Sequence, residues 1–256
     1  FYLILFWYGF MQTFLHVGCG PVKQSQIPGF RDKNWKEIRF DIDKNVKPDI
    51  LGTLTDMSQV KSGSVDAIYS SHNIEHVYPH EVPIVLNEFF RVLKEDGIVV
   101  ICCPDLQSVC ESVVNDKLYD PLYTTSEGLP ICPIDILYGW RLPISKGNEY
   151  MAHKGGFTYS VLSQEFTKAG FQSRYGGRSK NKWELFLVAF KQKKSEEEIN
   201  NLVSKQWDNI GRTFAEFPVS HKIKIIDDKI RAKIVFRFLR EFIIKLVVNY
   251  TFYMEI

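Results

Sequence analysis

Two glycines and a carboxylate near the start of the chain have the spacing of a nucleotide-type binding site. The apolar run that begins at Phe14 stops at Gly18-Cys-Gly20, and a second apolar run ends at Asp41. Glycine lets backbone approach a ligand that a side chain would push away. A carboxylate about twenty residues further on is the group with which doubly wound sheets hold ribose hydroxyls. Asp43 lies close by, but its position beyond the strand is typical of a solvated loop acid or a helix cap.

A histidine-rich segment allows a different chemistry. His72-Asn-Ile-Glu-His76 matches the inverted zinc-peptidase motif, in which His72 and His76 would share a helix face and hold zinc while Glu75 acts as base. The segment follows a buried strand, however, where a loop is expected. A zinc metallopeptidase is therefore kept only as a remote alternative, and we predict no bound metal ion. The Cys19 thiol has no base near it in sequence, which favours a small packing residue over a nucleophile.

Strand and helix signals alternate along the chain, which indicates a mostly parallel sheet covered by helices. Gly97 is expected to end a helix at Glu81–Lys94, and Gly170 to end one at Ser160–Ala169. Gly176–Asn181 is expected to be a turn. Strands are predicted at Thr13–Val17, Glu37–Ile42, Asp49–Leu54, Val65–Ser70, Ile98–Cys103, Phe171–Tyr175 and Trp183–Phe190, and helices at Glu81–Lys94 and Ser160–Ala169.

The domain is expected to span residues 11–194, with an insertion at about 104–156 that covers the substrate. Residues 1–10 are apolar but too short to cross a bilayer, and Met11 would be a natural initiator. We therefore expect them to lie upstream of the native start or to be the remnant of a longer segment. Residues 195–256 are predicted to be a helical appendage that begins with an exposed helix at Glu196–Trp207. From His221 onwards this appendage is basic and amphipathic, which fits packing on its own domain, self-association or contact with an anionic membrane.

Composition limits the class of protein. The chain has 256 residues, 45% apolar content and a net charge of +2, which do not suggest a nucleic-acid partner. Its five cysteines are odd in number and form no CxxC pair. This usage favours reduced thiols and a cytoplasmic location.

Five motifs in order make residues 13–191 similar to class I S-adenosylmethionine-dependent methyltransferases. The motifs are Gly18-Cys-Gly20, Asp41, Leu54-Thr-Asp-Met57, Ser64–Val77 and Phe89–Ile98. The segment Ala152-His-Lys-Gly-Gly-Phe157 further resembles bacterial methyltransferases of unassigned substrate. The resemblance implies an α/β, Rossmann-like, doubly wound sheet of seven strands with the last strand antiparallel. It also implies S-adenosyl-L-methionine as cofactor and S-adenosyl-L-homocysteine as product.

The same resemblance implies roles for individual residues. Gly18 and Gly20 would admit the amino-acid end of the donor, Asp41 would accept hydrogen bonds from the ribose, and Asp56 would accept one from the adenine amino group. The full implied set is His16, Gly18, Cys19, Gly20, Asp41, Ile42, Asp56, Met57, which would pack on the adenine ring, and Ser71 and His72, which would lie near the sulfonium.

The segment after the glycine turn departs from the family. Val22 stands where these enzymes often have a third glycine, and Pro28-Gly29 interrupts the long helix that usually follows. The helix is therefore expected to be short or replaced by a loop. A dinucleotide site would need a glycine where the chain has Lys23, which argues against a nicotinamide or flavin cofactor.

The methyl acceptor is not readable from the sequence. The resemblance favours a small molecule, with a saccharide-related compound as one candidate class, and His72, His76 and His153 are the predicted proton acceptors. A non-catalytic domain that binds only the cofactor or a partner is the competing hypothesis.

Overall fold

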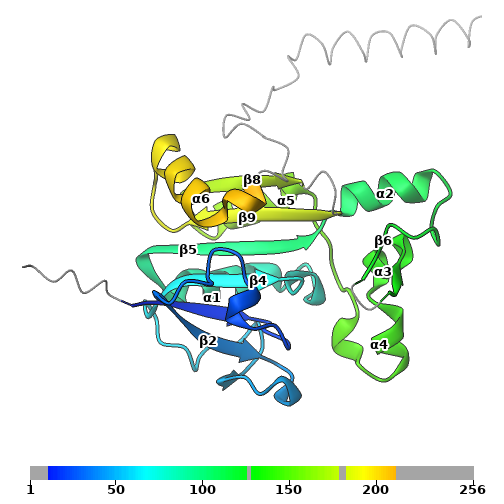
Figure 1. Cartoon of the computed structure of the whole chain (residues 1–256), viewed down its shortest axis with the longest axis horizontal. Coiled ribbons are helices and arrows are strands. Elements are labelled where there is room, and N and C mark those ends of the chain that lie inside the picture. Colours follow the sequence, from blue (N-terminus) through cyan, green and yellow to red (C-terminus); the bar gives the residue numbers. More distant parts are fainter. Residues whose placement is uncertain (1–10, 126–127, 179–182, 212–256) are drawn as a thin grey trace, which may run out of the picture. The chain divides into compact units, whose positions relative to one another are not determined.

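The computed structural model describes residues 11–125, 128–178 and 183–211 of the chain. A seven-stranded sheet has the order β3-β2-β1-β4-β5-β9-β8, and every pairing is parallel except those of β9 with β5 and β8 (Figure 1). The predicted α/β sheet with an antiparallel last strand is confirmed. Its strands are β1 (Gln12–Val17), β2 (Trp35–Asp41), β3 (Ile50–Leu51), β4 (Val65–Ser71), β5 (Leu93–Pro104), β8 (Ser173–Arg178) and β9 (Glu184–Phe190).

Helices α1 (Val82–Val92) and α5 (Tyr159–Lys168) cover one face of the sheet. Because successive strand side chains point to opposite faces, Leu15 and Val17 of β1 join this first cluster while Phe14 joins a second one. Apolar side chains of α1 recur at helical spacing and are buried against the sheet. The hydrophobic core therefore has two layers, one on each face of the sheet.

The other face is covered without a helix between β1 and β2. The segment there contains only the single 3-10 turn η1 (Gln24–Gln26), which confirms that the usual long helix is replaced by a loop. Phe30 of this loop stacks on Phe14 at 4.4 Å between ring centroids and meets Trp35 edge-on at 5.0 Å. Aromatic packing thus supplies apolar burial on a face that a helix would otherwise cover.

Helix α6 (Glu196–Gly211) completes that second face. Ile199 and Val203 are only 2% and 4% exposed and belong to the same cluster as Phe14 and Phe30. The helix predicted at the start of the appendage is present, but it is not exposed on all sides, because one apolar edge of α6 is buried on the sheet. The rest of the predicted appendage, including its basic segment from His221, lies outside the described residues, as does the predicted upstream segment 1–10.

Two glycines that were predicted to end a helix or to form a turn lie inside strands instead. Gly97 was expected to end a helix, but α1 stops at Val92 and β5 already begins at Leu93. A Cβ atom on Gly97 would lie 2.8 Å from Leu93 Cδ2 and 2.9 Å from the carbonyl oxygen of Lys94. Gly176, predicted in a turn, pairs with β9, and a Cβ atom there would lie 2.1 Å from the carbonyl oxygen of Phe186. Close approach of backbone, rather than a turn, explains both glycines.

The segment between β5 and α5 folds into short elements with a small apolar cluster of their own, which includes Val109, Ile131 and Ile136. Figure 1 shows its helices beyond the end of the sheet at which β5 stops. No helix among the described residues is long and apolar enough to cross a membrane. The elements are α2 (Leu106–Val114), β6 (Tyr123–Thr124), β7 (Pro130–Ile131), α3 (Pro133–Tyr138), α4 (Arg141–Ser145) and the 3-10 turn η4 (Glu149–Met151).

Candidate active site

The glycine turn lies at the carboxyl end of β1. Gly18 and Gly20 have φ angles of +64° and +47°, which glycine adopts without the strain that a Cβ atom adds. The amides of Gly18 and Cys19 donate to the carbonyl oxygen of Phe40, at 2.9 and 3.2 Å, so the turn is tied to the end of β2. A Cβ atom on Gly18 would lie 2.2 Å from Nδ2 of Asn73. Glycine is therefore required here both by conformation and by space.

Asp41 fixes the same turn with its side chain. Its Oδ2 accepts from the amide of Gly20 at 2.8 Å, and its Oδ1 accepts from the amide of Asp43 at 2.9 Å. The residue is 8% exposed. Asp43 instead caps the 3-10 turn η2 (Lys44–Val46) by accepting from the amide of Asn45, which is the cap role expected of it. Asp41 thus links the carboxyl ends of β1 and β2, which the sequence predicted to form one binding site.

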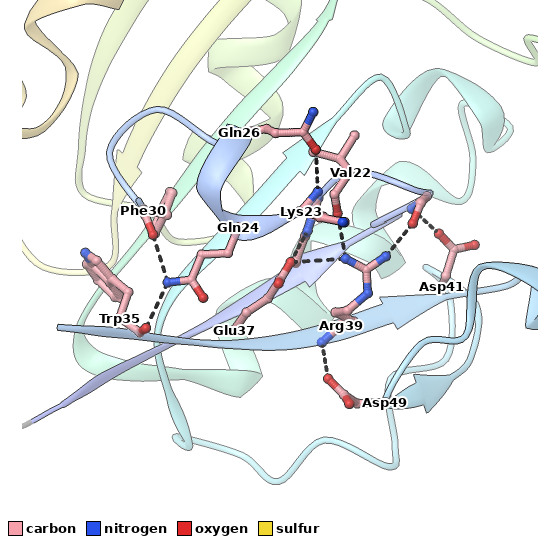
Figure 2. A network of polar contacts seen from close by, with 12 residues as sticks. Val22, Lys23, Gln24, Gln26, Phe30, Trp35, Glu37, Arg39, Asp41 and Asp49 are labelled. Atoms are coloured by element: carbon pink, nitrogen blue, oxygen red, sulfur yellow. Dashed lines mark hydrogen bonds and ion pairs between the residues drawn. The ribbon is translucent and has the colours of Figure 1, made fainter. Parts of the chain in front are cut away.

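Arg39 of β2 holds the loop that replaces the helix. Its guanidinium donates to the carbonyl oxygens of Gly20 and Val22, and Figure 2 shows it lying between the turn and Glu37. Gln24 acts in a similar way on the far part of the loop, because its Nε2 donates to the carbonyl oxygens of Phe30 and Trp35, both at 2.9 Å. Side chains therefore satisfy loop carbonyls that a helix would have paired internally.

We expect Arg39→Met to destabilise the glycine turn without leaving a cavity in the hydrophobic core. The substitution keeps an apolar stem but leaves the partly buried carbonyl oxygen of Gly20 and the exposed one of Val22 without their donor. A hydrogen bond from a charged group contributes about 1.5–3 kcal/mol, and each kcal/mol corresponds to roughly 2–4 °C of midpoint at this chain length. Thermal unfolding should therefore show a drop of several degrees. Lys36→Met, an exposed position of the same strand, is the matched control, and an equal drop in both variants would contradict the role of Arg39.

A cavity of about 560 Å³ opens at these strand ends. One wall consists of the glycine turn, Asp41 and Ile42, and another consists of His72, Asn73 and His76 from the loop after β4. Its volume is in the range of small-molecule and cofactor sites. The insertion and the segment after β3 complete the lining with Gly52, Thr53, Leu54, Thr55, Asn148, Glu149, Tyr150, Met151 and Lys154.

Comparison with known proteins identifies the part of the chain that forms most of this cavity. Residues 15–101, from β1 to near the end of β5, match the family described as "Methyltransferase domain". This part of the chain is a methyltransferase domain. The match confirms, at the level of the domain, the resemblance carried by the five sequence motifs, and it is consistent with the observed strand order. None of the curated proteins matches the sequence.

Several solved structures resemble the methyltransferase domain at low identity. A SAM-dependent methyltransferase from Methanosarcina mazei is 16% identical over 72% of this chain and 94% of its own, with a TM-score of 0.48. The Burkholderia thailandensis 1,6-didemethyltoxoflavin-N1-methyltransferase, with bound 1,6-didemethyltoxoflavin and S-adenosylhomocysteine, is 13% identical over 72% and 73%, with a TM-score of 0.45. Since both scores are below 0.5, the assignment of the domain rests on the family match.

Five residues of the predicted cofactor set, including Ser71 at the end of β4, do not line the cavity of the methyltransferase domain. His16 is buried on the opposite face of β1, where its Nδ1 lies 2.6 Å from Glu37 Oε1, and burial lowers its pKa. Cys19 points into the core, and desolvation raises its pKa to about 12, so the thiol stays neutral and is no nucleophile. Met57 is fully buried in the first core cluster, and Asp56 lines a separate surface hollow beside Arg91.

His72 lies at the cavity between two carboxylates. Its Nε2 is 3.1 Å from Glu184 Oε1 and its Nδ1 is 3.6 Å from Glu75 Oε1. Desolvation opposes the charge on the imidazole, but the two carboxylates outweigh it and raise the pKa of His72 to about 10. Its backbone has a φ of +51°, which is uncommon outside glycine. The side chain is 43% exposed, so solvent weakens these ion pairs. A histidine in this setting donates protons rather than accepting them.

The zinc-peptidase geometry is not formed. His72 follows β4 directly, and only Ile74–His76 make the single 3-10 turn η3, so His72 and His76 do not share the face of an α-helix. His76 instead meets His153 of the insertion, with 4.9 Å between ring centroids. His76 lines the cavity, whereas His153 lies behind it and burial lowers the pKa of His153.

Sequence reasoning missed two kinds of residue in this site. Asn73 lines the cavity and its Nδ2 is buried without a hydrogen-bond partner among the described residues, yet a lone asparagine after a strand carries no distinctive pattern. Arg39 looked like an ordinary polar residue of a half-exposed strand. The one usable signal was indirect, since a loop rich in buried carbonyl groups needs donors from elsewhere.

Proposed function

We propose that this protein transfers the methyl group of S-adenosylmethionine to a small-molecule acceptor. The observation that carries the proposal is the Asp41 carboxylate, which holds the glycine turn through the amide of Gly20 and faces the cavity next to it. A carboxylate in that position can accept hydrogen bonds from ribose hydroxyls, while glycine backbone leaves room for the rest of the donor.

The cavity lining suggests how the donor would lie. Ile42 and Leu54, which also line the cavity, would pack against the adenine ring in place of the buried Met57. The unpartnered Nδ2 of Asn73 would donate to the carboxylate of the donor's amino-acid end, beside Gly18. These assignments put polar ends against polar groups and the flat ring against apolar side chains.

Methyl transfer breaks the bond between sulfur and the methyl carbon and forms a bond between that carbon and the acceptor. The bonding pair stays on sulfur, which leaves S-adenosylhomocysteine. The protein therefore has to align three atoms and exclude water. An acceptor that carries a proton must also lose it, and His76 and His153 stay the predicted proton acceptors because His72 is held protonated.

The insertion supplies the wall that would face the acceptor. Asn148, Glu149 and Tyr150 line the cavity, and Lys154 joins them. Polar groups beside an aromatic ring suit a polar small molecule, including a saccharide-related one. The predicted role of the insertion as a cover over the substrate is part of this proposal.

Calorimetric titration of the full chain with S-adenosylmethionine and S-adenosylhomocysteine tests the proposal. We expect saturable binding of both compounds, and Asn73→Ala should weaken it by roughly tenfold because about one hydrogen bond to a charged group is lost. Asn115→Ala, which removes the amide that caps α2 far from the cavity lining, is the matched control and should bind normally.

The outcomes separate the competing hypotheses. If neither compound binds, a methyltransferase function is excluded. If both bind but the loaded protein releases no methyl group to any fraction of a metabolite extract, the non-catalytic hypothesis is favoured instead.

A further inference from the structure

Three potential metal ligands cluster at the wall of the cavity, which one of them, His76, lines. Glu75 and His76 belong to η3 after β4, and His153 comes from the insertion. One ligand atom of each residue lies within 4.8 Å of the others. The backbone keeps the segments together, because the amides of Lys154 and Gly155 donate to the carbonyl oxygen of Glu75 at 2.8 and 3.1 Å. The fold therefore brings His153 to two residues that are adjacent in sequence, Glu75 and His76.

The Glu75 carboxylate lacks hydrogen-bond partners among the described residues. The residue is 1% exposed, and neither Oε1 nor Oε2 has a hydrogen-bond partner among the described residues. His72 lies 3.6 Å away on one side, which is an ion-pair distance but too long for a hydrogen bond. A buried carboxylate is costly unless it is paired and hydrogen-bonded, or bound to a metal. A charged group left this incomplete points to a ligand that binds there.

The two histidines each present a free lone pair. His76 Nδ1 lies 3.0 Å from the carbonyl oxygen of Ala152, and His153 Nδ1 lies 2.6 Å from that of Ile136. A carbonyl oxygen only accepts, so each Nδ1 carries a proton and each Nε2 of the neutral ring keeps its lone pair. Metal-binding histidines usually have this arrangement, in which the second ring nitrogen donates to a carbonyl or carboxylate.

We propose that Glu75, His76 and His153 bind a divalent first-row transition-metal ion, through the carboxylate and the two Nε2 atoms. Two imidazoles and one carboxylate form a ligand set that zinc and its neighbours accept, and they leave coordination positions open. The ion would provide the direct partner that the Glu75 oxygens lack, in addition to the ion pair with His72. This site differs from the zinc-peptidase arrangement, in which Glu75 was the base and His72 a ligand.

The position of the site links it to the cavity. His76 lines the cavity wall, so an ion bound to it would lie beside the space proposed for the acceptor. The Nε2 lone pairs cannot accept a proton while they bind an ion. Occupancy of the site by metal therefore decides between this role and the proton-accepting role predicted for His76 and His153. The inference itself does not rest on the proposed function.

Metal titration of the full chain tests the site directly. The purified protein, treated with a chelator and freed of it, is titrated with Zn²⁺ by calorimetry and with Co²⁺ by visible absorption. We expect one ion per chain, and Glu75→Gln and His153→Ala should each weaken binding at least about tenfold, since even loss of an outer-shell partner costs 10–100-fold. His80→Ala removes an exposed histidine that stacks on Tyr78 outside the cluster, and it should leave binding unchanged.

Two results would overturn the inference. One is the absence of binding for Zn²⁺, Co²⁺, Mn²⁺ and Fe²⁺ alike. The other is binding whose affinity is the same in wild type, Glu75→Gln and His153→Ala, which would place the ion elsewhere. Circular dichroism of each variant checks the fold, and His153→Ala decides if Glu75→Gln does not fold. A parallel titration with S-adenosylhomocysteine on metal-free protein shows separately whether the proposed function fails.

Discussion

Replacing Asp41 with asparagine should weaken binding of S-adenosylhomocysteine by roughly 10–100-fold, because each lost hydrogen bond to a charged group is worth about 1.5–3 kcal/mol. The Asp41 carboxylate now accepts from two backbone amides, those of Gly20 and Asp43. An amide side chain has a single oxygen, so one of these N–H groups would face an NH₂ group instead. The glycine turn would lose its anchor and the ribose its acceptor in the same substitution.

Asp66→Asn is the matched control for that experiment. Asp66 also accepts from a backbone amide at the sheet, that of Thr13 at 2.8 Å, and it forms an ion pair with Lys94 at 2.9 Å. It does not line the cavity. Calorimetry should therefore show normal affinity for Asp66→Asn, even if its thermal midpoint falls. Equal affinities in wild type and Asp41→Asn would mean that the donor does not use this strand end.

The sheet was predictable because its strands are apolar runs separated by polar turns. Such runs can be recognised in the sequence whatever the residues around them. Strands β1, β4 and β9 accordingly lie within a residue or so of the expected ranges. Gly97 and Gly176 were misassigned because a glycine in sequence does not say whether it supplies a turn or merely leaves space. In both cases the deciding atoms belong to close contacts within the folded sheet.

The site was predictable only where it is local. The glycine turn and Asp41 are carried by strand ends, so their meeting follows from parallel pairing of β1 and β2. Met57 has the right residue type for packing on the adenine ring, but it is buried in the hydrophobic core. The sequence does not distinguish packing on a ligand from packing in the core. The contact between His76 and His153 joins segments far apart in the chain. Residue spacing in the sequence does not predict such a contact across an insertion of irregular structure.

Gly18→Ala should be among the most damaging single substitutions of the cavity. Alanine at a φ of +64° costs about 1–2 kcal/mol in backbone strain, and its Cβ atom would also lie only 2.2 Å from Nδ2 of Asn73. Asn73 would have to move into the space proposed for the donor. We expect a lower thermal midpoint together with loss of S-adenosylhomocysteine binding, measured by differential scanning and isothermal calorimetry.

Gly63→Ala isolates the backbone contribution, because Gly63 has nearly the same φ, +63°, and no atom within 4 Å of a Cβ placed there. Its midpoint should fall by the strain alone, and its affinity should not change. The double variant Gly18→Ala/Asn73→Ala removes the overlap, so it should recover part of the stability lost in Gly18→Ala but not the affinity, since the donor would still lack the Asn73 amide. If Gly18→Ala and Gly63→Ala lose equal stability, the side chain of Asn73 does not lie over the turn as described. Recovery of affinity in the double variant would instead remove Asn73 from the donor site while leaving the steric argument for Gly18 intact.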